Sequence, residues 1–84
     1  MIQETENAMP EVYALVPAEV WLLQMFTAKS AREGGIVRRQ VRDVERILGR
    51  VAFEREIRRR GYHVVENAGQ FIIFCNNEPI RVIC

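Results

Sequence analysis

The chain has 84 residues, of which 49% are apolar and 27% charged, and its net charge is +1. This length and composition exclude intrinsic disorder and a second core, so we expect one domain over residues 17–84, after a flexible lead over residues 1–16. The longest apolar stretch, residues 20–26, is far shorter than the roughly 20 residues of a membrane span. The acidic start of the chain is the reverse of a secretory signal, so we expect a cytoplasmic protein with no membrane partner.

The first predicted helix runs from Ala18 to about Ser30. Pro17 suits the first turn because proline has no N–H group that would lack a partner there. Gly34 and Gly35 follow the helix and end it. Apolar residues surround most of its circumference, so this helix must be buried or must face another chain. We therefore expect the helix from Ala18 to Ser30 to offer a homodimer contact.

A second helix is predicted from about Val37 to Leu48. Apolar residues recur along one of its faces at steps of three and four residues, at Val37, Val41, Val44 and Leu48. Arg39 and Asp43 are spaced to pair across one turn. Gly49 is placed to end the helix in a left-handed conformation.

A third helix is predicted over residues 51–60, with Phe53 and Ile57 as its inward anchors. Glu54 precedes Arg58 by four residues, and the same spacing separates Glu56 from Arg60. This order of charges stabilises a helix. Gly61 is expected to cap the helix.

Three extended segments follow, over residues 62–66, 70–75 and 80–83, with turns at residues 67–69 and 76–79. The apolar run at residues 71–74 is typical of a central strand that is covered on both faces, or on one face plus an interface. The register stays open, because a two-residue loop and a three-residue loop assign opposite faces to Phe71 and Ile72. The predicted fold class is therefore α+β, with three helices followed by a three-stranded antiparallel β-meander.

Two architectures are compatible with this order of elements. The order resembles a winged helix-turn-helix, in which residues 51–60 would lie in the major groove and the turn at residues 67–70 would be the wing. Two features oppose it: Glu45 would be buried between helices, and the wing tip carries no positive charge. In the other architecture, residues 53–84 form one αβββ unit.

The runs at residues 60–64 and 69–74 resemble the HicA-type toxins, which have a double-stranded-RNA-binding fold. In that family a histidine that follows the hairpin glycine is needed for RNA cleavage. This chain has Gln70 and Phe71 after Gly69, so the resemblance gives no support for ribonuclease activity. A toxin-like ribonuclease that depends on His63 is kept as a third hypothesis.

The sequence contains no recognisable catalytic or metal-binding arrangement. His63 is the only histidine, and nothing near it in sequence supplies a nucleophile or an orienting acid. Cys75 and Cys84 lack the paired spacing of a zinc site and are expected to be free thiols. We therefore expect no enzymatic activity, no cofactor and no metal.

Charge is unevenly distributed along the chain. Residues 29–60 hold eleven bases and five acids, a net charge of +6, whereas the segments on either side are acidic. Arginine outnumbers lysine eleven to one, and guanidinium groups bind phosphates and carboxylates in a fork geometry.

From this charge pattern we expect a non-enzymatic nucleic-acid-binding or regulatory module, with DNA or RNA as its partner. One alternative is a small adaptor or inhibitor, for example from a phage or other mobile element, that binds an acidic surface of a larger protein. The other is a solvated helical face with no ligand, since five acids are interleaved with the arginines and can pair with them. For either binding partner the candidate binding residues are nine arginines of the two basic helices: Arg38, Arg39, Arg42, Arg46, Arg50, Arg55, Arg58, Arg59 and Arg60.

Overall fold

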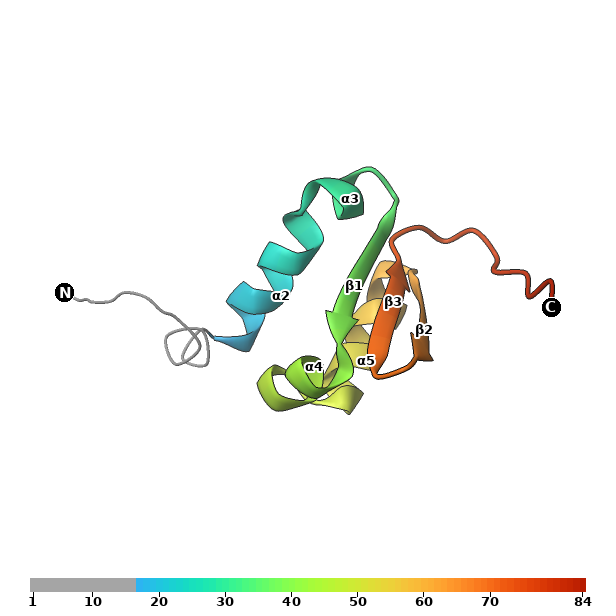
Figure 1. The fold of residues 1–84 in the computed structure, drawn as a ribbon. Coiled ribbons are helices and arrows are strands. Elements are labelled where there is room, and N and C mark those ends of the chain that lie inside the picture. The colour runs from blue at the N-terminus through green and yellow to red at the C-terminus, as the bar shows by residue number, and fades with distance from the viewer. Residues whose placement is uncertain (1–16) are drawn as a thin grey trace.

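The computed structural model describes residues 17–84, so the flexible lead expected over residues 1–16 lies outside the described residues. The strands form one antiparallel sheet in the order β1-β3-β2, which confirms the predicted α+β class (Figure 1). No helix within residues 17–84 has the length and apolar character that crossing a bilayer requires. The elements in chain order are α2 (Ala18–Thr27), α3 (Lys29–Arg32), β1 (Ile36–Gln40), α4 (Val41–Ile47), α5 (Arg50–Arg60), β2 (His63–Asn67) and β3 (Gln70–Phe74).

The strand β1 occupies the place where the sequence predicts the start of the second helix. Val37 points into the core and is 5% exposed, whereas Ile36 beside it is 45% exposed, which is the alternation of a strand. Val37 would point into the core in a helix and in a strand. The apolar spacing of the sequence therefore could not distinguish a helix from a strand here. Two features favour the strand. Ile36 and Val37 are β-branched, and this segment pairs with β3.

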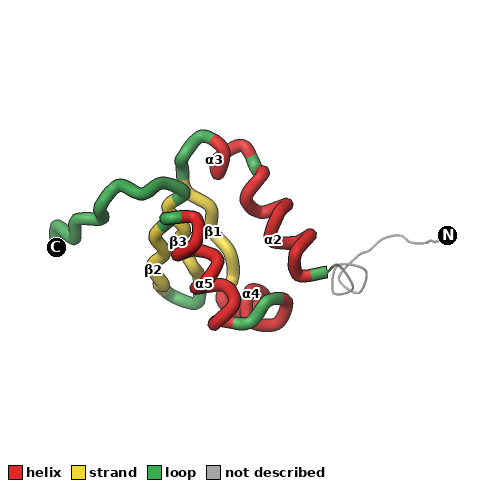
Figure 2. Tube along the Cα trace, turned by 180° about the vertical axis from the view of Figure 1, so that it is seen from behind, coloured by secondary structure: helices red, strands yellow, loops and turns green. Residues whose placement is uncertain are grey.

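The predicted strand at residues 80–83 is absent, so the expected meander and the αβββ unit are wrong in their third strand. The central strand β3 is already paired with β1 on one side and β2 on the other. The side chain of Asn76 donates a hydrogen bond to the carbonyl oxygen of Gly34 at 2.9 Å and accepts one from the backbone N–H of Glu78 at 3.0 Å. These bonds fix the exit of the chain, and the following residues run away from the sheet in both views (Figures 1 and 2).

The first helix is shorter than predicted and is buried on one side. It ends at Thr27. The backbone of the next residue, Ala28, is extended (φ −59°, ψ 152°), and the short α3 follows. Trp21, Met25 and Phe26 lie in the core. Val20 and Leu23 are exposed on the other side of α2.

The β2–β3 hairpin settles the register that the sequence left open. Its turn has two residues, Ala68 and Gly69, both with positive φ (51° and 77°), as in the type I′ turns that join twisted strands. Phe71 and Ile73 consequently point into the core.

The helices cover one face of the sheet only. The ring of Phe53 on α5 stacks on Phe71 of β3 at 4.7 Å between centroids. Seen from behind, α5 lies in front of the sheet, whereas the view of Figure 1 places it behind (Figures 1 and 2). We call the opposite side the helix-free face, since no helix of residues 17–84 lies over it. Its residues are Ile36, Arg38, Gln40, His63, Val65, Asn67, Gln70, Ile72 and Phe74.

Candidate nucleic-acid interface

The nine arginines singled out from the sequence do not gather on one surface. Arg38 and Arg39 lie on β1, and the others lie on or at the start of the helices α4 and α5. Within residues 17–84, three of the nine have no carboxylate partner, namely Arg38, Arg39 and Arg55. The other six are paired with an acid: Arg42, Arg46, Arg50, Arg58, Arg59 and Arg60.

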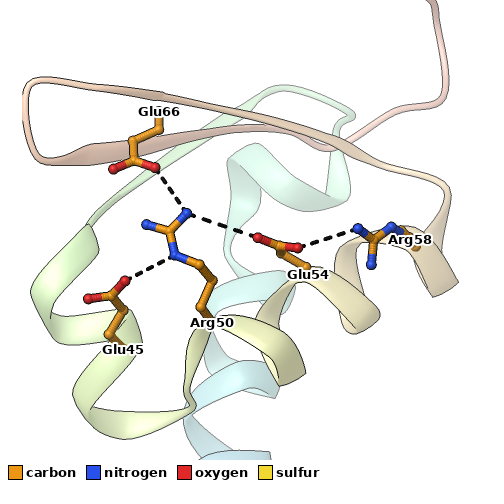
Figure 3. A network of polar contacts seen from close by, with 5 residues as sticks. All are labelled: Glu45, Arg50, Glu54, Arg58 and Glu66. Atoms are coloured by element: carbon orange, nitrogen blue, oxygen red, sulfur yellow. Dashed lines mark hydrogen bonds and ion pairs between the residues drawn. The ribbon is translucent and has the colours of Figure 1, made fainter.

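Arg50 is the centre of a network that joins α4, α5 and β2 (Figure 3). Its Nε atom lies 3.0 Å from a carboxylate oxygen of Glu45, and its Nη1 atom lies 3.1 Å from one of Glu66. Glu54 lies farther off, at 4.0 Å from the same Nη1 atom. Hydrogen bonds first to Glu66 and then to Glu45 raise the pKa of Arg50. Arg50 therefore connects elements of the fold rather than presenting a free charge.

Glu56 binds the two arginines at the end of α5. Its carboxylate accepts hydrogen bonds from Arg59 and, at 2.6 Å, from Nε of Arg60. The bond from Arg59 is the main reason that the pKa of Glu56 is lowered; burial opposes the shift and Arg60 adds to it. Ionised Glu56 therefore stabilises the fold above the ordinary carboxyl pKa, and this contribution is lost as the pH falls through its lowered pKa.

The pairs predicted within α5 are confirmed, whereas the pair predicted in the second helix is wrong. Arg58 reaches Glu54 at 3.3 Å, in addition to the Glu56–Arg60 contact. Arg39 lies in β1, so its side chain cannot meet Asp43 across a helical turn. Asp43 pairs instead within α4, with Arg46 at 3.3 Å and Arg42 at 3.8 Å.

The β1 arginines point to opposite sides of the sheet. Arg38 lies on the helix-free face beside Ile72, its partner in the register. Arg39 lies on the helix side, is half-buried and donates a hydrogen bond to the carbonyl oxygen of Arg38 at 2.6 Å. Neither guanidinium group shares a face with the outer side of α5.

The outer side of α5 carries three of the nine arginines. Phe53 and Ile57 face the core, and with about 3.6 residues per turn the residues opposite them point into solvent. No acidic residue lies in this outer row, because Glu54 and Glu56 flank it on either side. The row, here called the α5 outer face, consists of Val51, Arg55, Arg58 and Arg59.

The exposed position of the Glu45 side chain is compatible with a helix-turn-helix arrangement. The sequence suggests that this carboxylate would be buried between the two helices. In the structure the Glu45 side chain is 46% exposed and pairs with Arg50 across the turn between α4 and α5. The sequence did not indicate this contact, because Glu45 and Arg50 lie on different helices whose angle depends on the turn at Gly49.

A groove of about 340 Å³ separates α5 from β2. Its apolar wall includes Ile57, Val64 and Phe71, and its rim carries charges of both signs. His63 also lines the groove. Residues 17–84 contain no cluster of three or more histidine, cysteine or acidic side chains that could hold a metal ion.

The two cysteines are free thiols, and they differ in exposure. Cys75 is buried, which raises the pKa of its thiol, and Cys84 is exposed. Neither the thiols nor His63 lies among the polar contacts of the Arg50 network. In comparisons with known proteins, the chain matches no family model, no curated protein and no solved structure.

Proposed function

We propose that this protein is a nucleic-acid-binding module of the winged-helix type and that it binds duplex DNA through the α5 outer face. The order of elements supports this: a strand after the first helices, two helices joined by a tight turn, and a hairpin that pairs with the first strand. Gly49 forms the tight turn, with a φ of 89° that other residues rarely adopt. In this arrangement α5 is the recognition helix and the turn at Ala68 and Gly69 is the wing.

The observation that carries the proposal is the absence of acids from the α5 outer face. Arg55 has no ion pair within residues 17–84, and Arg58 and Arg59 keep side chains that are 74% and 65% exposed. The Arg58–Glu54 pair is exposed and adds little to stability, so DNA phosphates can compete with Glu54 for the Arg58 guanidinium group without unfolding the helix. Val51, which is 71% exposed, adds an apolar contact of the kind that thymine methyl groups accept.

The proposal predicts that Arg55→Ala weakens duplex binding, whereas Arg38→Ala does not. Both changes remove one exposed guanidinium group that has no carboxylate partner within residues 17–84, but Arg38 lies on the helix-free face. We expect Arg55→Ala to lower the slope of log affinity against log salt by about one, the effect of losing one phosphate contact. Fluorescence anisotropy of a labelled duplex over a salt series measures both quantities.

Two results would contradict the proposal. One is the absence of duplex binding at about 50 mM salt, where a protein with several phosphate contacts binds well. The other is an equal loss of affinity in the Arg55 and Arg38 variants, which would show that DNA does not bind preferentially at the α5 outer face. Circular dichroism of each variant checks that the fold is retained.

An acidic protein surface is the second candidate partner for the α5 outer face. Arg58 and Arg59 already bind the carboxylates of Glu54 and Glu56 in this structure, so their geometry suits carboxylates as well as phosphates. The wing tip at residues 67–70 carries no positive charge to contact a phosphate. Competition between polyglutamate and duplex DNA of matched charge separates the two candidates: preference for polyglutamate favours the adaptor or inhibitor.

A further inference from the structure

The sheet is open along β2. β2 pairs with β3 on one side, and among residues 17–84 no strand pairs with its other side. Val65 in the middle of the strand is 41% exposed, and Glu66 and Asn67 are also exposed. An open edge of this kind presents backbone N–H and C=O groups to which another extended chain can bind.

The groove between α5 and β2 lies along this open edge. A strand added to β2 would direct alternate side chains over the groove and the others toward the helix-free face beside Val65. The groove offers the apolar groups of Ile57 and Val64. The carboxylates at its rim, Glu54 and Glu66, are already paired with arginines of the same rim. A suitable occupant is therefore an extended, apolar segment.

Residues 80–84 of this chain have that composition. Ile80, Val82 and Ile83 are β-branched and exposed, the last two at 84% and 77%. Arg81 lies between Ile80 and Val82. The sequence predicts a strand here, and the structure gives the segment no strand partner.

In the structure the segment does not lie on the β2 edge of its own subunit. The Cys75 N–H donates to the carbonyl oxygen of Gly35 at 2.9 Å, and the Asn76 side chain binds Gly34 and Glu78. These three hydrogen bonds direct the chain away from the sheet, as Figure 1 shows. The β2 edge is therefore open to the same segment of a second molecule.

We propose that residues 80–84 of one copy bind the β2 edge of a second copy as a fourth strand, so that the protein forms a homodimer by exchanging these segments. Backbone hydrogen bonds then satisfy the open edge, and the exposed β-branched side chains are removed from water. Val82 and Ile83 make this contact, and the α5 outer face stays free. The inference is independent of nucleic-acid binding.

The first test is the oligomeric state of the full chain. Sedimentation velocity over the micromolar range is expected to show a dimer that the double variant Val82→Glu/Ile83→Glu converts to a monomer. The thermal midpoint of the monomer should be unchanged, because both side chains are largely exposed in a single subunit. The matched control is Leu23→Glu, which charges an exposed apolar residue of α2 and should leave the dimer intact.

The second test is a disulfide between two different chains. One chain carries Val65→Cys/Cys84→Ser, and the other keeps Cys84. Mild oxidation should join the two chains, whereas Gln24→Cys/Cys84→Ser on α2 should give no product.

Three results would overturn the proposal. The first is a chain that stays monomeric at every concentration. The second is a dimer that Leu23→Glu dissociates and that Val82→Glu/Ile83→Glu leaves intact. The third is an interchain disulfide that forms with Gln24→Cys and does not form with Val65→Cys. The last two would assign the dimer to α2, the contact predicted from the sequence.

Discussion

Arg50 illustrates how the setting of a residue decides its role. From the sequence it is one of nine equivalent candidates for binding a polyanion. In the structure its guanidinium group contacts carboxylates from α4 and β2 and lies 5.1 Å from the ring centroid of Phe71. The contact with Glu66 could not be predicted from the sequence, because it depends on the hairpin register. Arg55, in contrast, is exposed and has no carboxylate partner within residues 17–84.

At the same scale, the two thiols should react at very different rates. Burial and a raised pKa leave Cys75 with little reactive thiolate, whereas Cys84 is exposed. At low protein concentration we expect one rapid and one slow thiol per chain with a disulfide reagent such as Ellman's. Cys84→Ser should abolish the rapid phase, and denaturant should make both thiols rapid. Two rapid thiols in the folded protein would contradict the placement of Cys75.

At the scale of elements, the sequence predicts residues 50–74 best. α5 and the two hairpin strands lie within one residue of their predicted bounds, since glycines separate them and their apolar spacing is unambiguous. β1 was missed because the inward position of Val37 fits a helix and a strand equally. The strand at residues 80–83 was wrongly predicted because local propensity does not reveal that β3 already has two neighbours.

The hairpin turn allows a direct stability test. Ala68 has a φ of 51°, a left-handed conformation that alanine adopts at a cost of about 1–2 kcal/mol. Ala68→Asn creates the Asn-Gly pair that type I′ turns favour, and it should stabilise the protein by about 1 kcal/mol in urea denaturation. Ala68→Val at the same exposed position should be destabilising. Equal stability of all three proteins would be inconsistent with a left-handed residue 68.

At the scale of the whole molecule, a single small core joins the sheet to the helices. Phe53 is fully buried and stacks on Phe71, and Phe26 contacts Tyr62 edge-on at 5.5 Å between centroids. The guanidinium group of Arg60 covers Phe26, with its central carbon 4.3 Å from the ring centroid. The aromatic contacts therefore link α2, α5 and β3, which are distant in sequence.

We expect Phe53→Ala to leave the protein largely unfolded at room temperature. The expected loss of about 3–5 kcal/mol is as large as the whole stability of many small domains, roughly 5 kcal/mol. Phe53→Leu keeps most of the apolar volume and should fold with a lowered urea midpoint. Far-ultraviolet circular dichroism and urea titration of both variants measure the difference. A cooperative, native-like transition in Phe53→Ala would show that the core does not depend on this ring.

Trp21 gives this core an internal optical reporter. It is the only tryptophan of the chain, and it is 3% exposed on the helix that precedes the sheet in sequence. Its emission therefore follows whether α2 is packed into the core, while the backbone signal follows the strands and the other helices. A red shift that precedes the loss of ellipticity would mark α2 as a unit that opens before the remainder.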